Sequence, residues 1–215
     1  MAPPTLLVLI SGSGSNLQAL IDATKSTPPL LSATITHVIS NKKAAYGLTR
    51  AANAGIPTTY HNLVPYKKKH PTTEAAREAY DRDLAAHILK HKPDMVVCAG
   101  WMHILSPTCL GPLQGAGVDI INLHPALPGC FDGAGAIERA LEAWERGEID
   151  KTGVMIHHVI TAVDRGTPIV VREVPFVEGD TLERVEERIH AVEHVEIVKA
   201  TRIALDQRRE RLEKS

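Results

Sequence analysis

The sequence predicts an α/β fold: a three-layer, Rossmann-like, mostly parallel sheet with a C-terminal antiparallel hairpin and a long closing helix. Short apolar runs alternate with stretches of helical periodicity, which is the pattern of βαβ units. The runs at residues 95–99 and 119–123 are almost wholly apolar, as in strands buried on both faces of a parallel sheet. After residue 150 two strands flank a turn. The 215 residues fit a single domain with a parallel half, 1–124, and a second half, 125–215.

The first half consists of predicted strand and helix units. An apolar run at residues 6–10 precedes the turn SGSGSN and the helical pattern of residues 17–21, which indicates strand, turn and helix. Further predicted strands are residues 35–40, 57–60, 95–99 and 119–123. Further predicted helices are residues 44–54, 73–90 and a short piece that starts at Ser106. The basic cluster 67–69 is expected in a solvated loop.

The residue pattern of the second half predicts a helix over residues 137–144, followed by the hairpin. Residues 154–159 and 168–174 form its strands and AVDRG its turn. Asp180 resembles an N-cap, with Glu183 three residues on. The predicted apolar face of the closing helix is Leu182, Val185, Ile189, Val192 and Val195. The polar end RRERLEKS is expected to fray.

Composition excludes several classes of protein. Hydrophobic content of 44% and charged content of 23% are typical of globular proteins. A net charge of -1 gives no reason to expect a nucleic acid or an anionic membrane as partner. The cysteines are odd in number and form no CxxC motif, which favours a reducing compartment. The first apolar run is too short for a signal peptide or a membrane span, so a cytoplasmic protein is expected.

GSGSN lies between a predicted strand and helix. Glycines there let the backbone curl, and free N–H groups at a helix N-terminus can hold an anion such as phosphate. The segment fits neither GxGxxG nor the Walker pattern, so it does not indicate a dinucleotide or ATP. The alternative is a plain turn in which Ser15 or Asn16 caps the helix.

NLHP places Asn122 and His124 at the end of a buried strand, where alternate residues face the same side. An amide that stabilises an oxyanion and an imidazole that moves a proton are what acyl transfer needs. The alternative is a core histidine beside a strand end. Asp164 lies in the turn AVDRG, where the alternative is a solvent-exposed carboxylate that only caps the turn. If that turn folds over the strand end, Asp164 can hydrogen-bond His124 and favour the imidazolium.

HAVEH, residues 190–194, matches the HxxEH order of inverted zinc metalloproteases. It places His190 and His194 on one helix face, but a catalytic zinc needs a third protein ligand, and the downstream carboxylates lie in the charged tail. His157 and His158 are weak metal candidates because neighbours on a strand point to opposite faces. We expect one of them to face the site, and no metal cofactor.

Five segments together resemble the phosphoribosylglycinamide formyltransferases of the folate-dependent formyltransferase family. The segments are VLISGSGSNLQALID, ISNKKAAYGLTRAANAGIPT, AGWMHILSP, INLHPALPG and AVDRGTPIV. They recur in order along nearly the whole chain. The resemblance implies transfer of the formyl group of 10-formyltetrahydrofolate to the amine of glycinamide ribonucleotide in de novo purine synthesis. The sequence leaves open whether the protein is a monomer or a homodimer.

The resemblance also implies roles for individual residues. Asn122, His124 and Asp164 match the catalytic set: the amide and the imidazolium stabilise the oxyanion, and Asp164 keeps His124 charged. Residues matching the ribonucleotide-binding positions are Gly14, Ser15, Asn16, His190 and Glu193. Residues matching the folate-binding positions are Arg77, Met102, His103, Ile104, Leu105, Asn122, Ile160, Val163 and Asp164. His157 falls where the family also has histidine, as active-site support.

The chain departs from the family pattern in two places. Familiar bacterial members read SLLPKYPG or similar after NLHP, whereas this chain has the glycine-rich ALPGCFDGAG, so the loop 129–135 is expected to contact the ribonucleotide differently. His103 stands where arginine is frequent, which puts its side-chain role in doubt.

Formyltetrahydrofolate hydrolase and methionyl-tRNA formyltransferase remain as relatives with a similar motif, although each carries an extra domain. Outside this class, the zinc metalloprotease and a non-catalytic nucleotide-binding module remain alternatives.

Overall fold

The computed structural model describes residues 2–214 and divides into two compact units, one ending at Ile120 and the other starting at Ile121. The first unit contains a parallel sheet in the order β3-β2-β1-β4. Its strands are β1 (Thr5–Ile10), β2 (Thr34–Ser40), β3 (Thr58–Tyr60) and β4 (Met95–Cys98). β1 lies between β2 and β4, and its residues from Leu6 to Ile10 are completely buried. That burial explains why the run carries no polar residue.

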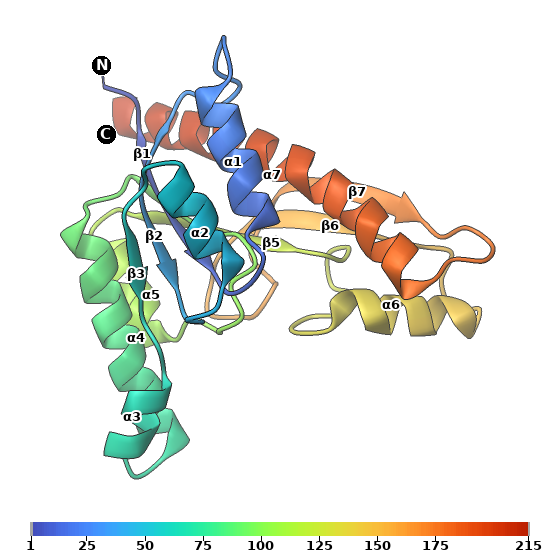
Figure 1. Ribbon diagram of the computed structural model, residues 1–215, viewed down its shortest axis with the longest axis horizontal. Coiled ribbons are helices and arrows are strands. Elements are labelled where there is room, and N and C mark those ends of the chain that lie inside the picture. Colours follow the sequence, from blue (N-terminus) through green and yellow to red (C-terminus); the bar gives the residue numbers. More distant parts are fainter. Residues whose placement is uncertain (1, 215) are drawn as a thin grey trace. The chain divides into compact units, whose positions relative to one another are not determined.

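Helices cover both faces of this parallel sheet. They are α1 (Ser15–Lys25), α2 (Tyr46–Asn53), α3 (Val64–Lys69), α4 (Thr73–Lys90) and α5 (Pro107–Gly115). The chain moves in one direction along the sheet from β1 to β3 and then reverses to reach β4. Because crossovers between parallel strands are right-handed, the reversal places α4 on the face opposite α1 and α2. Accordingly, α1 packs against α2, and α4 packs against α5 (Figure 1).

The second unit is built on antiparallel pairing. Its elements are β5 (Asp119–His124, from Ile121 on), α6 (Ala136–Glu145), β6 (Lys151–His158), β7 (Pro168–Pro175) and α7 (Leu182–Glu213). β6 pairs with both β5 and β7 in antiparallel register. α7 packs against β6, β7 and α6, and Figure 1 shows it as one long continuous helix. The predicted fold class, a parallel half followed by a hairpin and a closing helix, is confirmed.

Several local predictions were wrong. The basic cluster 67–69 lies in the short helix α3 instead of a loop. The N-cap of α7 is Thr181, whose hydroxyl accepts from the Arg184 N–H, while Asp180 accepts from the Val177 N–H and pairs with Arg188.

The long helix α7 also differs from its predicted face and end. Val195 is 64% exposed, because the buried face continues through Glu196 and Ile197. The polar tail stays helical through Glu213 instead of fraying. Within residues 2–214 no helix is both long and apolar enough to cross a membrane.

Candidate active site

β5 presents Asn122 and His124 from alternate positions of the second unit, as strand periodicity predicts. In the antiparallel register Asn122 lies opposite His157 of β6. The Asn122 amide nitrogen is 3.3 Å from His157 Nε2 and 3.2 Å from Asp164 Oδ1, to which it donates a hydrogen bond. A strand pair and the turn after it therefore bring these residues together.

Asp164 is at the centre of this group. Its Oδ2 accepts a 2.8 Å hydrogen bond from the Gly133 N–H and lies 3.5 Å from His124 Nδ1. Its Oδ1 lies 3.4 Å from His157 Nε2. The side chain is only 9% exposed, so the carboxylate interacts mainly with protein donors. The second unit thus brings together all three predicted catalytic residues and adds His157.

The turn that carries Asp164 depends on glycine at position 166. A Cβ atom on Gly166 would overlap the carbonyl oxygen of His158, because the turn closes tightly on the end of β6. The backbone of Asp164 itself has φ of 53°, a left-handed conformation that few L-residues adopt and aspartate tolerates better than most. With this backbone conformation the carboxylate lies beside Asn122 and His124 at the end of β5.

His124 has oxygen acceptors at both ring nitrogens. Nδ1 faces the Asp164 carboxylate, and Nε2 lies 3.2 Å from the carbonyl oxygen of Cys130. A neutral imidazole can donate from only one nitrogen, whereas an imidazolium donates from both. Both ring nitrogens of His124 therefore face an acceptor, so that an imidazolium, but not a neutral ring, could donate on both sides.

The pKa of Asp164 is below its ordinary value. Burial alone would raise this pKa, but hydrogen bonds from His157 and the Gly133 N–H and the positive charges of His124 and His157 outweigh it. Asp164 therefore stays ionised at neutral pH and provides the counter-charge that a protonated His124 needs.

The hydrogen bonds that the side-chain amide of Asn122 can donate depend on the protonation state of His157. His157 Nδ1 lies 2.9 Å from the His158 carbonyl oxygen, so a neutral ring donates there and leaves Nε2 as an acceptor for the amide. A protonated His157 instead donates from Nε2 to Asp164. One amide N–H of Asn122 is then released, and an amide N–H is the donor that a developing oxyanion requires.

The predicted anion loop belongs to the first unit. Gly14 has φ of 71° and precedes α1, whose first N–H groups have no acceptor within the helix. A Cβ on Gly14 would collide with the backbone of Gly47 in α2, whose N–H donates to the Gly12 carbonyl. Arg50 of α2 also donates to the Ser13 carbonyl, at 2.9 Å. α2 therefore fixes the loop at the N-terminus of α1, next to Ser15 and Asn16, with a cation nearby.

The predicted folate segment differs in exposure from residue to residue. Met102 is 70% exposed and Ile104 51%, whereas Leu105 is buried. The His103 side chain turns inward, with Nε2 2.6 Å from Asp81 Oδ1. Two large apolar side chains on the surface of one segment can pack against a flat ligand.

The remaining predicted folate positions divide between the units. Arg77 is half-buried on α4 in the first unit. In the second unit, Ile160 is 44% exposed and Val163 is half-buried, both in the turn that leads to Asp164.

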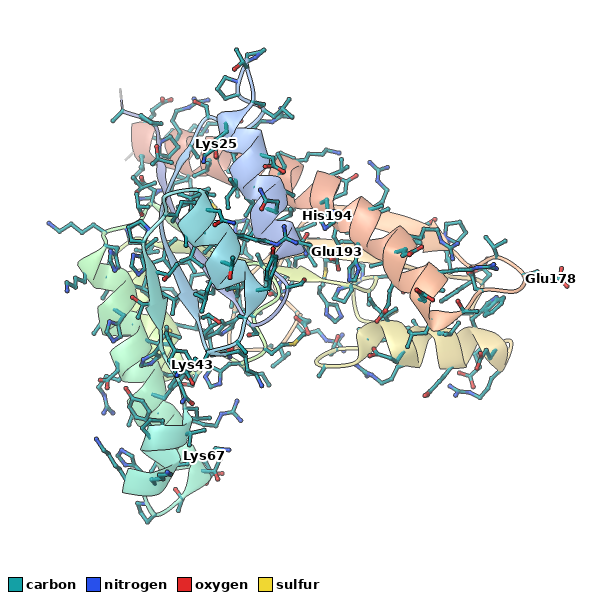
Figure 2. All side chains as sticks on the ribbon, viewed as in Figure 1. Lys25, Lys43, Lys67, Glu178, Glu193 and His194 are labelled. Carbon is teal, nitrogen blue, oxygen red and sulfur yellow. The ribbon has the colours of Figure 1, made fainter. Side chains whose placement is uncertain are left out.

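Sequence reasoning missed a cavity of about 330 Å³ in the first unit. It lies beside Met102 and His103, and Lys42 and Lys43 line it together with Tyr60 (Figure 2 labels Lys43). The position of NKK, residues 41–43, directly after β2 is the signal that could have found it, since ligands of parallel sheets bind at the carboxyl ends of strands. Sequence reasoning also missed Gly133 and the Cys130 carbonyl, for which the loop 129–135 gives no signal.

The HAVEH segment lies on α7. Glu193 is 4% exposed, whereas His190 is exposed and His194 is half-buried; Figure 2 labels Glu193 and His194 side by side on this helix. Among the described residues no group of three or more histidine, cysteine or acidic side chains is arranged to hold a metal ion.

Comparison with known proteins places this geometry in a family. The model of the formyl transferase family matches residues 5–201. The chain belongs to that family. The chain is 59% identical to a phosphoribosylglycinamide formyltransferase of Schizosaccharomyces pombe, over 91% of the chain and 94% of the relative. It is 48% identical to the Saccharomyces cerevisiae protein of the same name, over 94% and 97%.

Solved structures agree with this family assignment. Glycinamide ribonucleotide transformylase 1 from Geobacillus kaustophilus superposes with a TM-score of 0.80 at 32% identity, covering 94% of the chain and 99% of that structure. Glycinamide ribonucleotide transformylase 1 from Symbiobacterium toebii gives a TM-score of 0.79 at 33% identity, covering 94% of the chain and 87% of that structure. The fold and the family expected from the sequence are therefore both confirmed.

Proposed function

We propose that this chain transfers the formyl group of 10-formyltetrahydrofolate to the amine of glycinamide ribonucleotide, giving formylglycinamide ribonucleotide in de novo purine synthesis. The observation that carries the proposal is the group of Asn122, His124 and Asp164 within one unit, with both nitrogens of His124 facing acceptors. Relatives named for this activity match over nine-tenths of both chains. 10-Formyltetrahydrofolate is a co-substrate in this scheme.

In the proposed reaction the amine lone pair attacks the formyl carbon, and the carbonyl π electrons move onto oxygen. The imidazolium of His124 and an N–H of Asn122 stabilise that oxyanion. The attacking nitrogen then loses a proton, and the bond from the formyl carbon to N10 of the folate breaks as N10 gains a proton. His124 moves these protons, and Asp164 offsets the charge that the ring carries.

The two substrates are proposed to use different segments. Gly14, Ser15 and Asn16 hold the ribonucleotide phosphate through the N-terminus of α1, and His190 and Glu193 contact the same substrate. The proposed folate-binding residues are Arg77, Met102, His103, Ile104, Leu105, Asn122, Ile160, Val163 and Asp164. The support for these roles is the match of these positions to the family motif, except at His103, where arginine is frequent in the family. The free cysteines Cys98, Cys109 and Cys130 support a reducing, cytoplasmic location.

The test is a formyl-transfer assay on the purified chain with glycinamide ribonucleotide and 10-formyltetrahydrofolate. We expect transfer to the ribonucleotide and a large loss of kcat/KM with free glycinamide, which lacks the phosphate. Equal rates with both acceptors would reject the phosphate-binding assignment. Release of formate that is as fast without acceptor as with it would identify a hydrolase and contradict the proposal.

A further inference from the structure

The loop 129–135 contacts both members of the His124–Asp164 pair. The carbonyl oxygen of Cys130 accepts from His124 Nε2 at 3.2 Å, and the N–H of Gly133 donates to Asp164 Oδ2 at 2.8 Å. Both contacts use backbone atoms, so they depend on the path of the loop and not on its side chains. A displaced loop would release His124 and Asp164 together.

The conformation of this loop is unfavourable by itself. Gly129, Phe131, Gly133 and Gly135 all have positive φ, and at Phe131, with φ of 51°, this left-handed backbone is unfavourable because the Cβ atom crowds the following carbonyl oxygen. Glycines also lose the most conformational freedom on folding. Since the segment lies outside the helices and strands of the unit, another group must hold it in place.

Arg139 of α6 is that group. Its Nη2 lies 2.6, 2.8 and 2.9 Å from the carbonyl oxygens of Phe131, Asp132 and Ala134, and its Nε donates to the Gly135 carbonyl at 3.2 Å. The guanidinium carbon lies 5.9 Å from the centre of the Phe131 ring. Carbonyl oxygens that converge on one point repel one another unless a cation lies between them. The rigid fork of a guanidinium, unlike an ammonium, can donate to several of them in fixed directions.

A second contact ties the loop to the turn that carries Asp164. Arg165 donates to Asp132 Oδ2 from Nε at 2.7 Å and from Nη2 at 2.6 Å. Its side chain is 55% exposed, and exposed ion pairs contribute little to stability. Arg139, which is half-buried and contacts four carbonyl oxygens of the loop, is therefore the main fixing group.

We infer that Arg139 is a positioning residue for formyl transfer: it fixes the loop 129–135, through which Cys130 and Gly133 hold His124 and Asp164. It acts through the loop and contacts neither of those side chains. The inference rests on the proposed function for its kinetic consequences, but the fixing of the loop itself can be measured separately.

The kinetic test compares Arg139→Ala and Arg139→Lys with the wild type. We expect Arg139→Ala to lower kcat about tenfold to a hundredfold, because small misplacements of catalytic groups cost that much, with KM values within about threefold. The acid limb of the kcat profile should move to higher pH, because Asp164 loses the Gly133 hydrogen bond that lowers its pKa. The kcat of Arg139→Lys should lie between those of the wild type and Arg139→Ala. An ammonium can reduce the repulsion between the carbonyl oxygens, but it does not reproduce the geometry of the guanidinium.

Arg146→Ala is the matched control. It removes the same charge just after α6, where Arg146 is exposed and pairs with Glu148. We expect wild-type kcat and an unchanged pH profile for this variant. Circular dichroism of both variants should match that of the wild type. A loss of helical signal would reveal unfolding of α6.

Hydrogen–deuterium exchange of the loop 129–135 gives the readout that does not depend on activity. Arg139→Ala should exchange faster there, and Arg146→Ala should match the wild type. Unchanged exchange in Arg139→Ala would overturn the fixing role. Faster exchange with wild-type kcat and pH profile would overturn the catalytic consequence. A wild-type chain without formyl transfer would instead reject the proposed function and leave the exchange result standing.

Discussion

Asp81 in the first unit and Asp164 in the second both lie beside histidine, but they are held in different ways. Asp81 is completely buried, with one oxygen 2.6 Å from His103 and the other accepting from the Ser106 N–H at 2.8 Å. Asp164 is shared among Asn122, His124, His157 and the Gly133 N–H, at distances from 2.8 to 3.5 Å. Each oxygen of Asp81 therefore has one short hydrogen bond, whereas the Asp164 carboxylate is shared by four neighbouring groups.

We propose that this difference separates a structural carboxylate, Asp81, from a catalytic one, Asp164. Burial would raise the pKa of Asp81, but hydrogen bonds from His103 and Ser106 outweigh it, and the pKa is lowered. Through these two hydrogen bonds Asp81 links α4 to the segment before α5. Around Asp164, the contacts to two histidines and an amide are longer, at 3.2 to 3.5 Å, and these groups share one carboxylate. Substitutions should therefore affect turnover at one carboxylate and stability at the other.

The largest loss among changes to the partners of Asp164 is expected from Asn122→Ala. This variant removes an oxyanion donor, which typically costs about a hundredfold to a thousandfold in kcat, or roughly 3–4 kcal/mol. Thermal unfolding should stay close to that of the wild type because Asn122 is only half-buried. The measurement is steady-state kcat at saturating concentrations of both substrates. Near-normal turnover would remove Asn122 from the catalytic set.

His157→Asn should have an intermediate effect. The shorter amide can keep the bond to the His158 carbonyl but cannot reach Asp164 as Nε2 does, so we expect kcat to fall about tenfold. His157 lowers the pKa of Asp164. Without it that pKa rises, ionised Asp164 is lost at a higher pH, and the acid limb of the kcat profile moves upward. A pH profile identical to that of the wild type would show that His157 does not act on Asp164.

The smallest effect on turnover is expected from Asp81→Asn. The free energy of unfolding at pH 7 should fall by about 1.5–3 kcal/mol, the range for hydrogen bonds to a charged group, while kcat stays within about threefold of the wild type. Because the folded-state pKa of Asp81 is lowered, its contribution is present above the unfolded-state value of about 3.9 and disappears as pH falls through the folded-state value. Denaturant titrations of both proteins at pH 7 and in acid should therefore differ at pH 7 and converge in acid.

The sequence could predict the parts of the site that follow from periodicity and turn chemistry. Asn122 and His124 share a face because a strand alternates, and AVDRG forms a turn because Gly166 alone fits against His158. Periodicity and turn chemistry also predicted the hairpin and the bounds of α4, Thr73 and Lys90.

Other parts could not be predicted because they depend on backbone contacts between distant segments. The carbonyl of Cys130 and the N–H of Gly133 carry no side-chain signal, and Arg139 in the sequence is an ordinary polar residue of an amphipathic helix. The N-cap of α7 was misplaced by one residue for a similar reason: Asp180 and Thr181 are both good caps, and the pairing of Asp180 with Arg188 leaves the cap to Thr181.

The most direct test of the difference between the two carboxylates is to measure kcat and thermal unfolding of Asp164→Asn beside Asp81→Asn. We expect Asp164→Asn to lose about a hundredfold to a thousandfold in kcat, because His124 loses its counter-charge, and to unfold near the wild-type temperature. Asp81→Asn should show the reverse, a lower unfolding temperature with nearly normal turnover. An Asp164→Asn variant with wild-type kcat, or an Asp81→Asn variant that is as inactive as it, would contradict the assignment of catalysis to the Asp164 group.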